Sequence, residues 1–254
     1  MNRHPCLLAL VPAALGLLAL SGCTRTAPPA SRGPAGKRVD PATAAAVHGR
    51  ILFTGSIPRS AAIGMSADAF CGHANPGQPI DDSVLVGPEG GLQNAFVYVT
   101  DDMSAYAFDT PARAVRLEQK GCRFSPHVVG LQVGQTLELA NEDETLHNVH
   151  AITKVNDGFN IGATPAAVFR RSFTAPETMI TFRCDVHSWM TAYAGVLAHP
   201  YFAVTDASGR FELKGLPPGE YAIAAWHEKF GTRTGRVRVG PGVSKEIALT
   251  FGGV

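Results

Sequence analysis

The stretch TFRCDVHSWM, residues 181–190, brings a thiol, an imidazole and a thioether together within seven positions. Cys184 follows two apolar residues in alternate positions, so we expect its thiol on the buried face where a strand ends. His187 and Met190 would follow in the turn. A thiolate, an imidazole and a weak thioether suit copper better than zinc, which normally takes a fourth strong ligand, or calcium, which takes oxygens. The stretch therefore predicts half of a copper site.

The missing strong ligand should be a second histidine from elsewhere in the chain. His147 stands in NEDETLHNVH, residues 141–150, just after the strand-like residues 136–140. The expected set for one copper ion is His147, Cys184, His187 and Met190. The alternative gives these residues ordinary structural roles, with Cys184 as a core thiol and Met190 as a gap filler.

The sequence around these residues resembles the cupredoxin family of type 1 copper proteins, such as plastocyanin, amicyanin and azurin. The likeness covers residues 112–198, and the further stretches that follow the family's order and spacing are 124–126, 131–137, Asn141, 147–149 and 182–184. The spacing Cys-x-x-His-x-x-Met is similar to the short ligand loop of amicyanin. The resemblance implies a Greek-key β-sandwich and one-electron transfer through a single type 1 copper ion.

Two neighbours of the ligands have expected roles in tuning the site. Asn148 should tie the two ligand loops together by hydrogen bonding. Asp185 stands where the family usually has Thr, Ser or Gly, and a carboxylate there should favour the oxidised ion. His187, with Trp189 beside it, is the expected exit for the electron.

We expect no enzymatic activity. A binuclear electron-transfer centre needs two cysteines in the ligand loop, and only Cys184 is present. Multicopper oxidases need His-x-His motifs, whereas His147 and His150 are separated by two residues. The alternative to electron transfer is a non-redox periplasmic copper carrier, or an envelope module that binds carbohydrate or protein.

The start of the chain predicts export and lipid attachment. Residues 1–22 read as a signal peptide, because an apolar run too short to span a bilayer follows Arg3. The run ends in LSGC, which resembles a bacterial lipobox and implies lipidation of Cys23. Residues 23–46 carry few large apolar side chains and are the expected flexible tether. We expect the periplasmic side of the cell envelope, anchored in the outer rather than the inner membrane.

The chain has five cysteines. One lies in the signal peptide, Cys23 would carry the lipid and Cys184 would bind the metal, so Cys71 and Cys122 remain. In an oxidising compartment these two predict a disulfide. The competing interpretation is a second metal site formed by Cys71 and Cys122 with His73 and His127. The sequence assigns no function to His73, His127, His150, His199 or His227.

The rest of the globular chain is rich in short strand patterns and lacks helical periodicity, which predicts an all-β protein. Residues 205–211 and 215–221 resemble the carboxypeptidase regulatory-like family, a small transthyretin-type β-sandwich. The opening strands of that family fit residues 48–51 and 94–99, far upstream. We therefore predict a discontinuous sandwich, residues 47–110 plus 199–254, with the cupredoxin domain, residues 111–198, inserted in it. The alternative is two domains in series.

The formal net charge is +1. A chain so close to neutrality has no electrostatic basis for binding nucleic acid. The expected partners are a redox protein, such as a periplasmic cytochrome or oxidoreductase, and the membrane through the lipid anchor.

Overall fold

The computed structural model describes residues 36–77 and 79–252. The predicted signal peptide, the lipidation site Cys23 and the first part of the tether lie outside the described residues. In the part of the chain that is described, no helix is long and apolar enough to cross a membrane.

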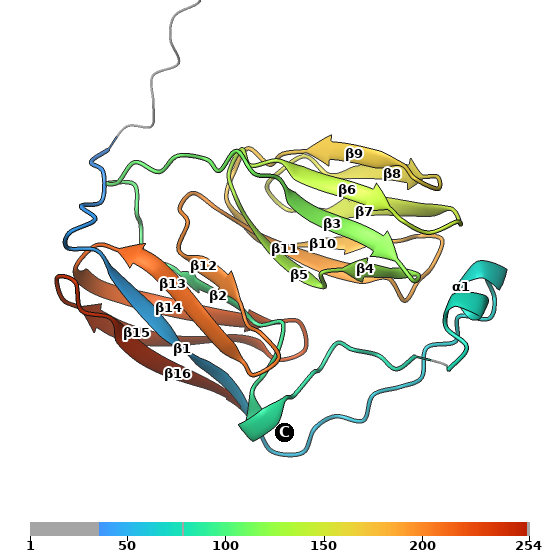
Figure 1. The fold of residues 1–254 in the computed structure, drawn as a ribbon, viewed down its shortest axis with the longest axis horizontal. Helices are drawn as coiled ribbons and strands as arrows, with labels where there is room; N and C mark the ends of the chain where they lie inside the picture. The colour runs from blue at the N-terminus through green and yellow to red at the C-terminus, as the bar shows by residue number, and fades with distance from the viewer. Residues whose placement is uncertain (1–35, 78, 253–254) are drawn as a thin grey trace, which may run out of the picture. The chain divides into compact units, whose positions relative to one another are not determined.

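The described chain is almost entirely β-structure, which confirms the predicted all-β class. Its two helical elements are short: α1 (Ala69–Ala74) and the 3-10 turn η1 (Pro88–Gly90). The strands form four sheets, and Figure 1 shows them as two separate pairs.

The first pair packs a sheet of order β13-β1-β16 on a sheet of order β12-β2-β14-β15. Alternate side chains of both sheets, such as Val47, Ile51 and Ile223, are fully buried between them. Its strands are β1 (Ala45–Thr54), β2 (Phe96–Val99), β12 (Phe202–Val204), β13 (Arg210–Leu216), β14 (Gly219–His227), β15 (Gly231–Val239) and β16 (Lys245–Gly252).

The second pair packs a sheet of order β5-β11-β10-β7-β8 on a sheet of order β4-β3-β6-β9. Leu117, Leu137 and Phe182 lie in the core between them. Its strands are β3 (Val115–Lys120), β4 (Arg123–Ser125), β5 (Val128–Gln132), β6 (Leu137–Asn141), β7 (His147–Ile152), β8 (Phe159–Ala163), β9 (Val168–Arg171), β10 (Glu177–Arg183) and β11 (Thr191–Leu197).

The order of the strands along the chain separates the two pairs. All strands of the second pair lie between β2 and β12, and those of the first pair come from both sides of that stretch. β2 and β12 are antiparallel neighbours, with Tyr98 opposite Phe202. An insertion into the first sandwich requires this pairing.

The two sandwiches meet in a small apolar cluster, in which the rings of Phe96 and Phe202 lie against two glycines. Gly130 of β5 and Gly195 of β11 are register partners, and the ring of Phe96 lies against both. A Cβ atom at Gly195 would stand 2.2 Å from that ring. The absence of side chains at this pair lets Phe96, which is 0% exposed, fill the junction.

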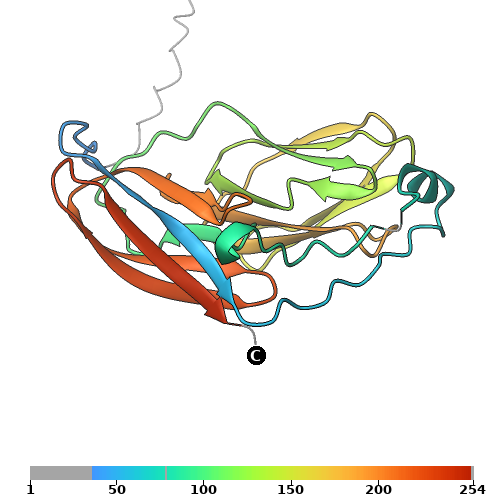
Figure 2. The same cartoon turned by 60° about the horizontal axis from the view of Figure 1, so that its bottom comes forward.

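The segment that follows β1 leaves the first sandwich and reaches the second. Figures 1 and 2 show it running to α1 at the far end of the second pair of sheets and returning through η1 to β2. Met65 and Cys71 of this segment are buried in the second core. We call residues 55–77 and 79–87 the covering segment. Near α1 it contacts the predicted ligand His187, through Asp68 and Cys71.

Candidate metal centre

Strand pairing brings two of the predicted ligands to one end of a sheet. β7 and β10 are antiparallel neighbours, with His150 opposite Arg183. His147 begins β7 and Cys184 directly follows β10, so both lie at the same end of these two antiparallel strands. The alternation expected before Cys184 is present, because Phe182 is 0% exposed and Cys184 is 2% exposed.

The loop after Cys184 is closed by backbone hydrogen bonds. Met190 N–H donates to the carbonyl of His187 at 3.0 Å, and Cys184 N–H donates to the carbonyl of Met190 at 3.2 Å. These bonds turn the loop back on itself and bring His187 beside Cys184. Met190 is 1% exposed and lies in the same core as Cys184.

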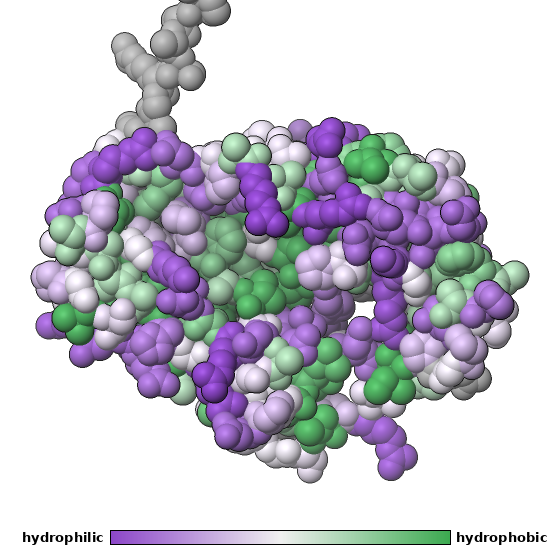
Figure 3. Space-filling view, viewed as in Figure 1, coloured by the Kyte–Doolittle hydropathy of each residue, from purple (hydrophilic) through white to green (hydrophobic). Residues whose placement is uncertain are grey.

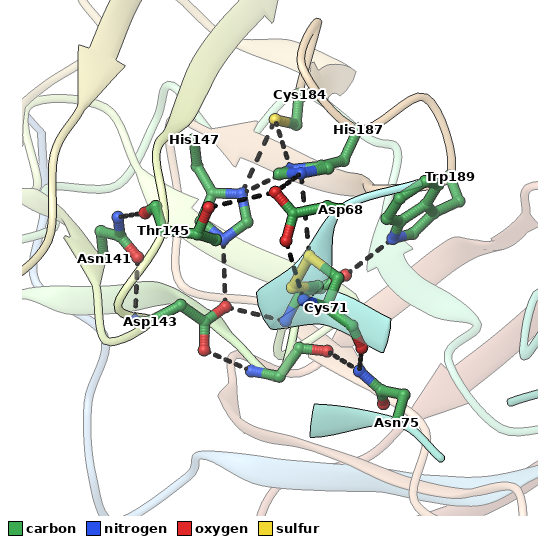
Figure 4. The surroundings of a disulfide bond; sticks show 12 residues. Asp68, Cys71, Asn75, Asn141, Asp143, Thr145, His147, Cys184, His187 and Trp189 are labelled. Atoms are coloured by element: carbon green, nitrogen blue, oxygen red, sulfur yellow. Dashed lines mark hydrogen bonds and ion pairs between the residues drawn. A yellow bond between two sulfur atoms is a disulfide. The ribbon is translucent and has the colours of Figure 1, made fainter. Parts of the chain in front are cut away.

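Three donor atoms converge at this end of the sandwich (Figure 4). The Nδ1 atoms of His147 and His187 lie 2.9 Å apart. Cys184 Sγ lies 3.9 Å from Nδ1 of His147 and 3.8 Å from Nδ1 of His187. All three side chains are buried, and they form one of the groups with metal-binding geometry in the described residues.

These distances fit an ion held by two imidazoles and a thiolate. Trigonal bonds of about 2.0 Å to nitrogen and about 2.3 Å to sulfur separate sulfur from nitrogen by about 3.7 Å. The observed separations of 3.8 and 3.9 Å agree with this. The two nitrogens, 2.9 Å apart, would have to part by roughly half an ångström. The donor set therefore accepts such an ion with a small shift of the rings.

A carboxylate faces the outer nitrogen of each imidazole. Asp143 Oδ2 lies 3.0 Å from Nε2 of His147, and Asp68 Oδ2 lies 3.3 Å from Nε2 of His187. A carboxylate that accepts the Nε2–H bond fixes the tautomer in which Nδ1 carries the free lone pair. Both rings are thus oriented with that lone pair toward Cys184.

The same contacts shift the ionisation of the buried groups. Burial opposes protonation of His147, but its hydrogen bonds to Asp143 and Cys184 outweigh burial and raise its pKa to about 9, so the imidazole of the metal-free protein holds a proton at Nδ1 that an incoming metal ion would displace. Burial also opposes ionisation of Cys184, yet the contact with His147 and nearby backbone N–H groups lower the pKa of this thiol. The surroundings favour the thiolate, which is the form that binds a metal.

The sequence did not reveal either carboxylate. Asp143 is 4% exposed and accepts N–H bonds from Gly121 and Cys122, both at 2.7 Å. The spacing of four residues between Asp143 and His147 is the one feature of the local sequence that could have indicated their contact. Asp68 caps the start of α1, where its Oδ1 accepts the N–H of Cys71 at 2.8 Å. Nothing local to Asp68 indicated that it would contact His187.

Cys71 and Cys122 form a disulfide, as predicted, across a sequence separation of 51 residues. Near it, Asn75 Nδ2 donates to the carbonyl of Gly121 at 3.1 Å, and Trp189 Nε1 donates to that of Cys122 at 3.0 Å. Together these contacts hold α1 against the ligand loop.

The disulfide and α1 cover the outer edge of His187. Cys71 Sγ lies 3.7 Å from its Nε2, and the imidazole is 3% exposed. The residue expected to be the electron exit is therefore shielded from solvent. Its ring contacts that of Trp189, with centroids 5.0 Å apart. Trp189 lines a cavity of about 460 Å³ beside the covering segment, on a face that Figure 3 shows hollowed.

Asn148 bridges the two ligand loops. Its Oδ1 accepts the N–H of Asp185 at 2.6 Å, and its Nδ2 donates to Asp185 Oδ2 at 3.0 Å. The Asp185 carboxylate is half exposed, and it also contacts His150 and Asn160. It thus points away from the three converging donors.

Three of the remaining histidines have protein partners. His127 pairs with Glu228, and the Nδ1 atoms of His199 and His227 accept backbone N–H bonds. Within residues 36–77 and 79–252, neither His73 nor His127 belongs to a group with metal-binding geometry. The structure thus supports the predicted disulfide, which takes up both sulfurs, over the alternative second site with these two histidines.

Comparisons with known proteins found no matching family model and no matching curated protein. Solved structures with similarity include the Cu-containing nitrite reductase NirK from Thermus scotoductus SA-01, with 24% identity over 38% of this chain and 24% of that one, at a TM-score of 0.32. An oxidised mutant of amicyanin matches with 19% identity over 33% of this chain and 81% of its own, at 0.30. A purple cupredoxin from Nitrosopumilus maritimus matches with 19% identity over 32% and 97%, at 0.28.

Proposed function

We propose that this protein binds one copper ion through His147, Cys184 and His187, with Met190 as a weak axial ligand, and that it carries single electrons. The observation that supports this most is the convergence of two Nδ1 atoms and a thiol sulfur, all buried and within 3.9 Å of one another. This donor set is the one that blue-copper electron-transfer sites use.

The surroundings of the donors suit a carrier because they limit movement. Asp143 and Asp68 each hold the outer nitrogen of an imidazole, and backbone hydrogen bonds close the loop from Cys184 to Met190. Copper would supply the one-electron couple. The chain keeps the donors in one arrangement, so little reorganisation accompanies the change of oxidation state.

The proposal also covers the domain that holds the copper centre and the compartment in which the protein works. We infer that residues 111–198 form a cupredoxin domain inserted in a discontinuous sandwich of residues 47–110 plus 199–254, except that the covering segment, which was predicted to belong to that sandwich, packs on the inserted domain instead. The pairing of Tyr98 with Phe202 supports this. Export by residues 1–22 and lipidation of Cys23 would anchor the protein on the periplasmic side of the envelope, where a redox protein would exchange electrons with it.

A redox titration of the copper-loaded protein tests electron transfer. We expect one electron per chain, taken up and released reversibly over repeated cycles without loss of copper. His150→Ala is the matched control, because it removes a nearby histidine that is not one of the proposed ligands. A protein that releases copper on reduction would be a non-redox carrier, and the proposal would be wrong.

A further inference from the structure

The cavity beside Trp189 is formed by three parts of the chain that are far apart in the sequence. The covering segment contributes residues 61–64 and 81–83, the second sandwich contributes Trp189, and the turn after β14 contributes Glu228. The volume of about 460 Å³ lies within the range of roughly 300–1,000 Å³ that is usual for small-molecule sites. We call this space the Trp189 cavity.

Hydrogen bonds within the chain hold one wall of the Trp189 cavity in place. The two limbs of the covering segment are joined where Ile63 N–H donates to the carbonyl of Pro79 at 2.7 Å. Arg123 of β4 then ties this segment to the second sandwich through an ion pair with Asp82 at 2.6 Å. The wall is therefore preformed, and a ligand would not have to order it.

The carboxylate of Glu228 is a nearly buried polar group that lines the cavity, with 10% of its side chain exposed. Its Oε1 contacts Nε2 of His127, and its Oε2 accepts the hydroxyl of Tyr193 at 3.2 Å. Burial and the charge of Glu228 raise the pKa of Tyr193 to about 12, so this hydroxyl keeps its proton and donates. A carboxylate oxygen can accept two hydrogen bonds. Glu228 therefore keeps acceptor capacity for a donor in the cavity.

The acidic and basic side chains that line the cavity oppose one another. They are Asp81, Asp82, Arg123, His127, Glu228 and Lys229. Asp82 pairs with Arg123, and Glu228 pairs with His127. Because these charges already have partners of the opposite kind, an incoming ion would lose hydration without gaining a free counter-charge. The lining therefore favours an uncharged ligand.

Trp189 and Phe124 give the cavity an aromatic wall. The indole Nε1–H of Trp189 donates to the carbonyl of Cys122 at 3.0 Å, which orients the ring and satisfies its one polar atom. What the indole offers to the cavity is thus apolar ring surface. Another aromatic ring packs on such a surface in an offset-stacked or edge-to-face arrangement.

We propose that the Trp189 cavity binds a small, uncharged aromatic molecule with hydroxyl groups, of the phenol or hydroquinone class. Its ring packs on Trp189, and a hydroxyl donates to Glu228. Neither residue is a proposed copper ligand, so binding does not depend on copper. The indole also contacts the ring of His187, with centroids 5.0 Å apart, so the ligand touches a side chain that itself touches the copper centre of the proposed function.

Calorimetric titration of the metal-free full chain with hydroquinone, without oxygen, tests this site. We expect saturable binding of one molecule per chain. The dimethyl ether of hydroquinone keeps the ring but cannot donate a hydrogen bond, so it should bind on the order of ten-fold more weakly. The charged phenols hydroxybenzoate and tyramine should also bind more weakly than hydroquinone. The proposal would be overturned if hydroquinone showed no saturable binding, or if the ether or either charged phenol bound as tightly.

Variants locate the bound molecule. Glu228→Gln should weaken hydroquinone binding on the order of ten-fold, because a hydrogen bond to a charged acceptor is lost. Glu246→Gln is the matched control, since it changes an exposed acid on β16. Trp226→Phe leaves Trp189 as the one tryptophan of the chain, and hydroquinone should quench its fluorescence with the dissociation constant found by calorimetry.

Binding that is as tight in Glu228→Gln as in the control, or that leaves the fluorescence of Trp189 unchanged, would place the molecule elsewhere and overturn the proposal. The comparison of hydroquinone with its ether uses the unaltered protein, so it decides the matter even if a variant fails to fold. Every measurement uses metal-free protein, so a failure here is distinct from a failure of the copper proposal.

Discussion

Removal of the disulfide should destabilise the protein by about 4 kcal/mol. Cys71 and Cys122 close a loop with a separation of 51 residues, and the chain-entropy model assigns about that free energy to a loop of this length. The perturbation is the pair Cys71→Ala and Cys122→Ala. Both sulfurs are fully buried, so their loss also removes packing in the second core.

The assay is urea unfolding of the metal-free protein, followed by tryptophan fluorescence. Cys184→Ala is the matched control, since it removes one buried sulfur that closes no loop. Hydrogen exchange should also accelerate in α1 and in the ligand loop, because the contacts that cover His187 are released, while β1 and β16 keep their protection. A loss of stability no larger than that of Cys184→Ala would refute the reasoning.

Three further predictions concern the junction, a buried histidine and the axial ligand. Gly195→Ala should lower the free energy of unfolding by about 1–3 kcal/mol, because its Cβ would meet the Phe96 ring at 2.2 Å. Adding Phe96→Leu to this variant should restore part of that loss, measured by urea unfolding. Burial lowers the pKa of His227 to about 4 in the folded protein, against an ordinary value of 6.5 in the unfolded chain. Below pH 6.5 the unfolded chain therefore binds more protons than the folded protein. The free energy of unfolding should fall as the pH drops from 6.5 toward 4, by about 2 kcal/mol at pH 5. His227→Phe should remove that pH dependence, and an unchanged dependence would contradict the assignment. Met190→Leu should keep the absorption of the copper protein and raise its reduction potential, measured by voltammetry, whereas a lowered potential would exclude Met190 as the axial ligand.

The sequence was informative where the chemistry is local. Cys184, His187 and Met190 lie in one short loop, and the strand alternation before Cys184 shows which way its thiol points. His147 could be placed because a strand pattern precedes it. Cys71 and Cys122 could be paired because the other cysteines already had roles.

The surroundings of His187 could not be predicted because they come from far along the chain. Asp68 and Cys71 lie in the covering segment, which has no strand or helix periodicity and was assigned with the first sandwich. They reach His187 only through tertiary contacts and the disulfide. The same holds for Phe96, whose place depends on Gly130 and Gly195 being register partners.

The central claim is that two imidazoles and one thiolate hold copper at the end of the second sandwich. The visible absorption spectrum during titration with Cu(II) tests it most directly. We predict an intense thiolate-to-copper charge-transfer band that saturates at one ion per chain, disappears in Cys184→Ser and weakens in His147→Ala and His187→Ala. A protein that binds one Cu(II) ion with no such band would contradict the claim.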